Sequence, residues 1–404
     1  MENIVNSISA FYDIIYKNKK GNPITMTEPM ELYIHIPFCV RKCRYCDFLS
    51  FAGMYQGFSK EYFLKLNEEL KFYSELYNKP LLRSVFIGGG TPGMASSEEI
   101  GSVMETIKTF YRLTKDCEIT IETNPGVTDF EKLKSFRQSG INRLSIGVQS
   151  FDDNVLKTMG RIHTSLDGEN AFNMAREAGF ENINIDLIFG YPGQTIESFT
   201  ETLKKTIELS PEHISSYSLI VEEGTCLCDD IVNGKISEPD DEIDREMYSI
   251  ACEMLVRAGY ERYEISNFSK PGKESIHNKG YWTAVPYIGV GLGAASFLDG
   301  VRYKNTCDFY HYINSINSDV RNPKDTEVLS LKEQMDEFMM LGFRLSEGPS
   351  SSLFKEKFGV EYKEEYKETL EKLSGKGLIV EDKRNFRLTD KGLDLGNEVF
   401  GEFI

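Results

Sequence analysis

The chain has 404 residues and a formal net charge of −17, from 46 basic and 63 acidic side chains. This length allows more than one domain with a sizeable core. The acidic balance argues against a broad nucleic-acid footprint, which needs a basic patch, and against adsorption to anionic lipid. No stretch approaches the roughly 20 apolar residues of a membrane span, and residues 1–16 do not read as a secretory signal. A cytosolic protein with reduced cysteines is therefore expected.

The first apolar run, 32–38, leads into three cysteines spaced C-x3-C-x2-C: Cys39, Cys43 and Cys46. Iron–sulfur clusters are normally held by four thiolates, so three thiolates leave one iron of a cubane cluster open to a small molecule. A structural zinc site would need a fourth ligand, for which only His35 is close in sequence. A disulfide does not suit three cysteines in one loop. The spacing resembles the radical S-adenosylmethionine (SAM) signature, which implies a 4Fe–4S cluster with SAM on the open iron.

Six short β-rich runs then alternate with five helical patterns. The β-rich runs are 32–37, 84–87, 118–123, 143–148, 182–189 and 213–221. The helical patterns, with apolar residues at i, i+3, i+4 and i+7, are 60–76, 98–111, 129–139, 166–178 and 195–209. This alternation predicts a parallel sheet with right-handed crossovers in an α/β protein. An open doubly wound sheet is one solution, but polar motifs after successive strands favour a TIM-type barrel, and six units predict a partial (β/α)6 barrel.

Polar motifs lie at the ends of these strands, where a barrel recruits its functional side chains. The turn GGGTP at 88–92 lets backbone N–H groups approach a ligand closely. Later strand ends supply Glu122, Gln149, Arg161 and Asp186. Glu122 could accept from an amine, Gln149 and Asp186 could bind ribose hydroxyls, and Arg161 could pair with a carboxylate. The alternative for each is a polar side chain that only caps the barrel end.

The last third of the chain lacks the regular alternation of β-rich runs and helical patterns. Residues 242–309 predict a helix and then loop-rich, glycine-rich sequence that packs against the open side of the barrel. From about residue 332, helices precede a two-stranded hairpin, an order that resembles a winged-helix domain. Residues 355–404 hold ten basic against twelve acidic side chains, which favours a structural or docking role over DNA binding. The predicted division is an N-terminal extension (1–30), a radical SAM partial barrel (31–225), a barrel-packing region (226–325) and a winged-helix-like domain (326–404).

Residues 33–309 together resemble the coproporphyrinogen dehydrogenase-like family of radical SAM proteins. The resemblance implies a 4Fe–4S cluster on the three cysteines of the loop. It also implies SAM contacts from Tyr33, Gly89, Gly90, Thr91, Glu122, Gln149, Arg161 and Asp186. Tetrapyrrole-oxidising members carry a further cysteine two positions after the last cluster cysteine, and a longer N-terminal segment. Here that position is Phe48 and the extension is modest, which points to the sister branch of HemW-type heme chaperones.

The H-N-x-x-Y-W motif of that branch is present as HNKGYW at residues 277–282. The resemblance implies heme binding by His277, Asn278, Tyr281 and Trp282. An imidazole is a standard axial ligand of heme iron, and the two rings offer flat apolar surface. The alternative is a core histidine beside a packed aromatic pair.

We therefore expect a heme-binding chaperone that carries a SAM-ligated 4Fe–4S cluster and delivers heme to an apo-hemoprotein. The main alternative is an oxygen-independent coproporphyrinogen III dehydrogenase. In that case an electron donor such as flavodoxin or ferredoxin reduces the cluster, and a radical from SAM removes hydrogen from the tetrapyrrole. A third hypothesis makes the cluster structural and the C-terminal domain the working part. Whether the protein is an enzyme stays open at this point.

Overall fold

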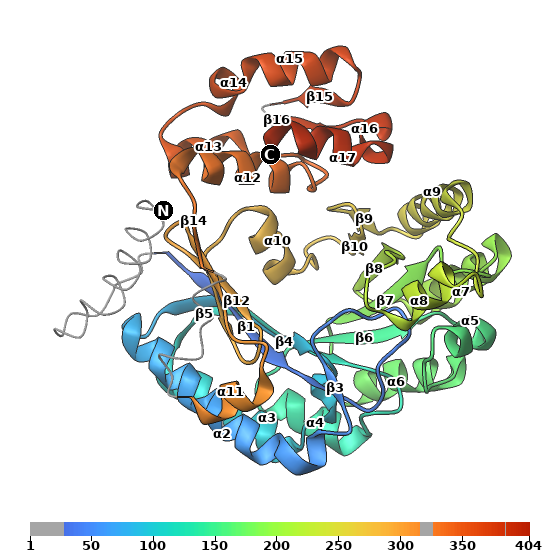
Figure 1. The fold of residues 1–404 in the computed structure, drawn as a ribbon, viewed down its shortest axis with the longest axis vertical. Coiled ribbons are helices and arrows are strands. Elements are labelled where there is room, and N and C mark those ends of the chain that lie inside the picture. The colour runs from blue at the N-terminus through green and yellow to red at the C-terminus, as the bar shows by residue number, and fades with distance from the viewer. Residues whose placement is uncertain (1–27, 316–325, 384) are drawn as a thin grey trace.

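The computed structural model describes residues 28–315, 326–383 and 385–404, and its centre is a curved sheet. The sheet has twelve strands in the order β14-β13-β12-β11-β1-β4-β5-β6-β7-β8-β10-β9 (Figure 1). Six successive strands are parallel: β1 (Met30–Ile36), β4 (Leu81–Gly89), β5 (Arg112–Thr123), β6 (Arg143–Gln149), β7 (Ile183–Phe189) and β8 (His213–Ser218). Every predicted β-rich run falls on one of them. The α/β class with a parallel core is therefore confirmed.

Helices cover one face of the parallel core, as the apolar periodicity predicts. They are α2 (Tyr55–Leu76), α3 (Ser97–Phe110), α4 (Phe130–Gln138), α6 (Ser165–Glu177) and α7 (Ile196–Leu209), with a short α5 (Asp153–Thr158) before α6. Capping boxes at Ser96 and Thr164 satisfy the first backbone N–H groups of α3 and α6, which explains where these helices begin.

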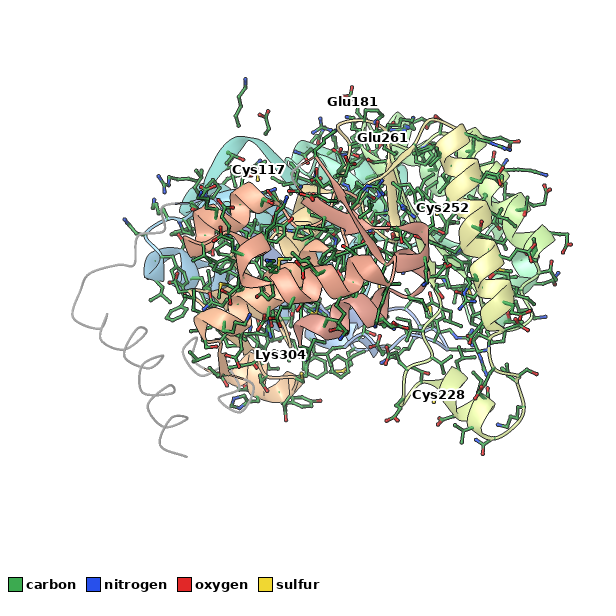
Figure 2. The ribbon with its side chains drawn as sticks, turned by 90° about the horizontal axis from the view of Figure 1, so that it is seen from above. Cys117, Glu181, Cys228, Cys252, Glu261 and Lys304 are labelled. Atoms are coloured by element: carbon green, nitrogen blue, oxygen red, sulfur yellow. The ribbon has the colours of Figure 1, made fainter. Side chains whose placement is uncertain are left out.

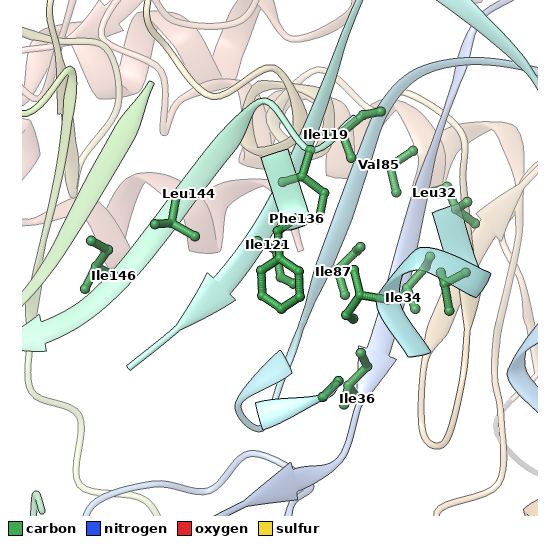
Figure 3. Close-up of a cluster of buried hydrophobic side chains, with 14 of the residues drawn as sticks. Leu32, Ile34, Ile36, Val85, Ile87, Ile119, Ile121, Phe136, Leu144 and Ile146 are labelled. Carbon is green, nitrogen blue, oxygen red and sulfur yellow. The ribbon is translucent and has the colours of Figure 1, made fainter. Parts of the chain in front are cut away.

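The two faces of the parallel strands differ sharply in polarity. Aliphatic side chains at alternate positions pack in one buried layer; among them are Leu32, Ile34, Ile36, Val85, Ile87, Ile119, Ile121, Leu144 and Ile146 (Figure 3). The intervening positions point to the opposite face and include buried Glu31, Ser84, Glu118, Arg143 and Asn184. The helix side therefore holds the hydrophobic core, and the concave side is a polar, water-poor interior.

Residues after β8 lengthen the sheet at both edges. Beyond β8 lie β10 (Asn267–Ser269) and β9 (Glu261–Arg262), both antiparallel. At the other edge β11 (Tyr287–Val290) pairs parallel with β1, followed by antiparallel β12 (Ala295–Leu298), β13 (Val301–Lys304) and β14 (Glu327–Val328). Helices α8 (Cys226–Val232), α9 (Asp241–Arg257), α10 (Ile276–Trp282) and α11 (Phe309–Asn314) lie between these strands in the chain. The predicted loop-rich sequence after α9 is interrupted by these short strands, and Gly291 and Gly293 lie in the turn between β11 and β12.

The C-terminal residues form a helical unit with a hairpin, as expected. Its elements are α12 (Leu331–Gly342), α13 (Ser351–Phe358), α14 (Tyr362–Glu365), α15 (Lys367–Gly375), β15 (Ile379–Asp382), β16 (Asn385–Leu388), α16 (Asp390–Asp394) and α17 (Gly396–Phe400). It buries a hydrophobic cluster of its own, centred on Phe338, Phe354 and Tyr362. Helix α10 lies between this unit and the sheet, in contact with both α12 and β4 (Figure 1). Among the described residues, no helix combines the length and apolar character that crossing a membrane requires.

Candidate functional site

A cavity of about 460 Å³ opens at the carboxyl ends of the parallel strands. Its wall brings together ten of the side chains and glycines predicted from sequence: Cys39, Cys43, Cys46, Gly89, Gly90, Thr91, Glu122, Gln149, Arg161 and Asp186. These positions span 148 residues of chain, from 39 to 186 inclusive. Because parallel strands end at one edge of the sheet, motifs after successive strands converge there.

The cysteine loop is anchored at its base by two short paired strands, β2 (Phe38–Cys39) and β3 (Phe51–Ala52). Cys39 is buried, whereas Cys43 and Cys46 are half-buried at the cavity wall. Burial, together with the nearby Cys43 and Cys39, raises the pKa of the Cys46 thiol to about 11. The three thiols are thus close neighbours on one side of the cavity.

This donor set fits an iron–sulfur cluster. Within the ranges that the structure describes, no three histidine, cysteine or carboxylate side chains converge on a single ion position. A 4Fe–4S cluster does not need such convergence, because each thiolate binds a different iron. The thiols therefore need to border a cavity large enough for the cluster, and the loop provides that arrangement.

The glycine turn after β4 is held closely against β1 and β2. Gly90 donates its N–H to the Ile36 carbonyl at 2.8 Å, and a Cβ at position 90 would lie 2.6 Å from the Phe38 carbonyl oxygen. Gly89 has a φ of +113°, and a Cβ there would lie 2.6 Å from the His35 ring. Only glycine fits at these two positions. The turn therefore exposes backbone to the cavity with no side chain in between.

Two carboxyl groups lie deep in the cavity wall. Glu122 accepts a hydrogen bond from the Gly89 N–H at 3.1 Å, and burial, followed by the nearby Asp186, raises its pKa to about 8. Asp186 accepts from Ser145 Oγ at 2.9 Å and from Asn184 Nδ2 at 2.7 Å, and burial raises its pKa also. The pair could bind a ligand that brings an amine or hydroxyl donors.

Arg161 lies in the loop between α5 and α6, and not at a strand end as predicted. Its side chain connects the cysteine loop to the strand ends. Its Nη1 lies 3.4 Å from Cys43 Sγ, and its Nη2 donates to Asn124 Oδ1 at 2.6 Å. Asn124 also donates to Thr91 Oγ1 at 2.9 Å. Sequence reasoning did not select Asn124 as a site residue, although it follows Glu122 closely at the same strand end. Its place two residues after Glu122 was the sequence feature that could have identified it.

Gln149 reaches the cavity through an irregular strand end. The register of β6 against β7 shifts between Gly147 and Gln149, and Gln149 adopts a left-handed φ of +67°. A Cβ at Gly147 would lie 2.5 Å from Asn124 Oδ1 and 2.9 Å from Gln149 Nε2. A non-glycine residue in this conformation is uncommon and is often found at functional sites. The bulge turns the amide toward the cavity.

Tyr33 is the one predicted SAM contact that does not line the cavity. Its hydroxyl lies 3.0 Å from His35 Nδ1, and the His35 Nε2 lies 2.8 Å from the Leu49 carbonyl oxygen. Burial raises the pKa of Tyr33 above its usual range. Tyr33 thus supports His35, whose ring lies under the glycine turn.

The mouth of the cavity is apolar and exposed. Phe48, Tyr217 and Ile220 line it with exposed fractions of 63%, 39% and 69%. The cationic side chains of Arg41 and Lys42 border the same opening. Large apolar groups are rarely left exposed together without a function. The acidic side chains of Asp47 and Glu222 line the same cavity. This mouth suits an apolar ligand.

The HNKGYW motif forms α10 and lies apart from the cavity wall. His277 is 1% exposed; its Nδ1 lies 2.9 Å from Ser84 Oγ and its Nε2 lies 3.0 Å from Tyr281 Oη. Burial, with the cations Arg143 and Arg83 nearby, lowers the pKa of His277 to about 3. The imidazole is therefore neutral, and both of its nitrogens already have partners.

The other members of the motif have structural contacts. Asn278 donates its backbone N–H to Ser275 Oγ, which caps α10. The Tyr281 ring packs edge-on against Tyr287 with centroids 4.9 Å apart. The guanidinium of Arg344 lies 4.4 Å above the Trp282 ring, and the buried indole Nε1 has no hydrogen-bond partner among the residues that the structure describes. Trp282 therefore joins α10 to the C-terminal unit.

The other cysteines lie outside the cysteine loop. Cys117 is on β5, Cys228 on α8 and Cys252 on α9, and Figure 2 shows the three well separated. All are free thiols. None lines the cavity wall beside the cysteine loop.

Comparison with known proteins identifies two matching families and several long relatives. Residues 33–206 match the Radical SAM superfamily and residues 329–395 match the HemN C-terminal domain. The heme chaperone HemW of Bacillus subtilis is 40% identical over 373 residues, which is 92% of this chain and 98% of the relative. That of Lactococcus lactis is 37% identical over 379 residues, 94% of this chain and 98% of the relative.

Among solved structures, the coproporphyrinogen III oxidase HemN of Escherichia coli, a radical SAM enzyme, superposes with a TM-score of 0.81. The match covers 98% of this chain and 93% of that chain at 23% sequence identity. At this identity the likeness shows a shared fold. It covers both the barrel and the C-terminal unit.

Proposed function

The chain belongs to the radical SAM superfamily and, within it, to the family of the HemW heme chaperones, and we propose that it binds heme and delivers it to an apo-hemoprotein. The observation that carries the proposal is the likeness to the Bacillus subtilis HemW, 40% identical over 98% of that relative. A likeness over nearly the whole length includes the cysteine loop, the cavity, α10 and the C-terminal unit.

We propose that Cys39, Cys43 and Cys46 hold a 4Fe–4S cluster and that SAM binds beside it. The donor set and the cavity support the cluster. The glycine turn at Gly89 and Gly90, whose Cβ positions are blocked, supports close approach of a ligand to the backbone. In this superfamily the cluster supplies an electron to SAM. The chain's own residues would bind and orient the ligand: Thr91, Glu122, Gln149, Arg161 and Asp186 from the wall, with Tyr33 behind His35.

We propose His277 as the axial ligand of heme iron, with Asn278, Tyr281 and Trp282 around it. A neutral imidazole with a free Nε2 is the required donor. In the described conformation Nε2 is occupied by the Tyr281 hydroxyl at 3.0 Å and the side chain is buried. Heme ligation therefore requires α10 to move or His277 to exchange Tyr281 for iron.

The second candidate function is oxygen-independent coproporphyrinogen III dehydrogenation. The apolar mouth beside the cysteine loop supports this alternative, because a tetrapyrrole bound there would lie near SAM. Phe48 argues against the dehydrogenase function, since oxidising members of the family carry a further cysteine at that position. An electron donor such as flavodoxin or ferredoxin would be needed only if SAM is cleaved.

A cytosolic location and the division of the chain into four parts, with boundaries at residues 30, 225 and 325, are also proposals.

One experiment separates the two functions. The protein with its cluster reconstituted is incubated anaerobically with reductant and SAM, either with heme or with coproporphyrinogen III. A chaperone forms a stable heme complex, passes the heme to an apo-hemoprotein and leaves coproporphyrinogen unchanged. A decarboxylated divinyl product without heme binding would replace our proposal with the enzyme.

A further inference from the structure

A chain of buried hydrogen bonds leads from the cavity wall to α10 across the polar face of the sheet. It starts at Asp186, whose Oδ1 accepts from Asn184 Nδ2 at 2.7 Å. The Asn184 Oδ1 lies 2.6 Å from His213 Nδ1, and the His213 Nε2 lies 2.8 Å from the Tyr263 hydroxyl. Tyr263 Oη in turn accepts the N–H of Ser275 at 3.4 Å. Ser275 is the N-cap of α10.

A buried carboxylate on β5 extends the chain from Ser275 to the first turn of α10. Glu118 accepts from Ser275 Oγ and from the backbone N–H of His277, both at 3.2 Å, and from the N–H of Ile276 at 3.2 Å. The first turn of the helix that carries His277 is therefore held by the same network that ends at Asp186.

Each member of the chain has one donor–acceptor role. The Asn184 amide donates its N–H groups to Asp186 and Ser145. Its oxygen must therefore accept the hydrogen bond shared with His213. His213 must then donate from Nδ1, and burial holds its pKa well below the usual range, which leaves Nε2 to accept from Tyr263. No member can exchange its donor and acceptor roles without its neighbour doing the same. A change in hydrogen bonding at Asp186 is therefore transmitted toward Ser275.

Water cannot easily replace these bonds. The exposed fractions are 2% for Asn184, 0% for His213, 9% for Tyr263 and 0% for Ser275. In a low-dielectric interior a lost hydrogen bond leaves an unpaired group, which is costly, so neighbouring groups rearrange instead.

We propose that this chain couples occupancy of the SAM site at Asp186 to the position of α10, with Asn184, His213 and Tyr263 as positioning residues. The inference rests on the proposed function, because the second state of α10 is the one in which His277 is free to bind heme iron. Hydroxyl donors of SAM compete with Asn184 for the Asp186 carboxylate. Once Asn184 turns, His213 and Tyr263 lose their fixed partners and Ser275 loses part of its anchor.

The expected sign follows from this order of events. SAM loosens the first turn of α10 and so raises the heme affinity. By thermodynamic linkage, heme raises the SAM affinity by the same factor, which we expect to be about fivefold or more. Neither ligand needs to contact the other.

The single tryptophan of the chain, Trp282, is a built-in reporter on α10. The test uses heme-free protein with its cluster reconstituted. SAM binding is measured by equilibrium dialysis, and Trp282 emission is recorded with excitation that SAM does not absorb. Wild type should change its emission along the SAM binding curve. Tyr263→Phe, which removes the hydroxyl shared by His213 and Ser275, should bind SAM with an emission change at least halved.

Tyr260→Phe is the matched control, because Tyr260 is also buried but donates to the Pro211 carbonyl outside the chain of hydrogen bonds. It should respond as wild type does. If wild type binds SAM and Trp282 emission stays constant, or if Tyr263→Phe responds fully, the coupling is refuted. Should Tyr263→Phe not fold, heme titrations of wild type with and without SAM decide, since an unchanged heme affinity overturns the proposal. Failure of heme to bind at all would remove the proposed function but leave the fluorescence result standing.

Discussion

Arg161 places its Nη1 atom 3.4 Å from the Sγ of Cys43, although 118 residues separate the two in the chain. One guanidinium group therefore faces both a predicted cluster ligand and the amide of Asn124 at a strand end. The proposed binding of the cluster and the proposed binding of SAM would share this contact. Tests of the site must separate loss of iron from loss of the ligand beside it.

The cluster should depend on the cysteine loop alone. Cys39→Ala, Cys43→Ala and Cys46→Ala should each lose the brown charge-transfer absorbance, because each removes the thiolate of one iron. Cys117→Ala and Cys252→Ala, which lie on β5 and α9, should keep it. Iron and sulfide analysis after anaerobic reconstitution is the measurement. Full iron and sulfide in the triple variant of the loop would show that the cluster is elsewhere.

SAM binding should depend on Glu122 and Arg161 without loss of iron. A hydrogen bond to a charged group contributes about 1.5–3 kcal/mol, so Glu122→Ala and Arg161→Ala should each weaken SAM binding about 10–100-fold. The EPR signal of the reduced cluster, titrated with SAM, reports the affinity. Glu131→Ala on α4 is the charge control. An EPR spectrum of wild type that saturating SAM leaves unchanged would exclude an open iron.

Glu122 should make stability pH-dependent in a defined direction. Burial raises its pKa from 4.5 to about 8 in the folded chain, so the folded state holds a proton that the unfolded state has released. This contribution is fully present below pH 4.5 and is lost as pH rises through about 8. The free energy of unfolding of the metal-free chain should therefore fall over this range relative to Glu122→Gln, which carries no titrating group. Parallel pH curves for the two proteins in denaturant titrations would contradict the prediction.

His277 should be required for axial ligation of heme. His277→Ala should lose the Soret shift of bound heme while keeping the cluster and the response to SAM. His311→Ala, at an exposed position on α11, is the matched control. Heme binding should persist in Cys39→Ala, because the imidazole does not depend on iron at the cluster site. An unchanged axial-ligand spectrum in His277→Ala would make this residue a core histidine.

Tyr281→Phe tests whether the bond between Tyr281 and His277 opposes heme binding. The hydroxyl occupies Nε2 at 3.0 Å, and a typical intramolecular hydrogen bond contributes about 0.5–1.5 kcal/mol. Its removal should therefore raise the heme affinity about 2–10-fold, measured by heme titration at constant SAM. A lower affinity would mean that Tyr281 holds His277 in its ligating position.

The parallel core could be predicted from sequence because its strands and helices are long enough to show their periods. The helices 55–76 and 196–209 carry the i, i+4 pattern over several turns. The cavity followed from the rule that parallel strands end together. Strands β10 to β13 hold only three or four residues each, which is too short for a period to be recognised. They take their structure from the strands beside them.

The surroundings of His277 could not be read from the sequence. Its partners Ser84 and Tyr281 are 193 and four residues away, and the contact with Ser84 depends on how α10 packs on β4. Tyr33 is a similar case, because alternation places it on the concave face but does not say that His35 lies between it and the cavity. Local patterns predict the face of a strand, whereas packing decides which neighbours share that face.

The opposite polarity of the two strand faces makes the barrel intolerant of changes in length. A one-residue deletion within β5 would shift the alternation of side chains along the strand. Either the residues before the deleted position or the residues after it would then face the other side of the sheet. In the former case Glu118 and Thr120 would enter the aliphatic layer, and Ile119 would enter the polar interior. Insertions in the crossover loops leave this phase unchanged. Length variation among relatives should therefore concentrate in the loops and spare the strands.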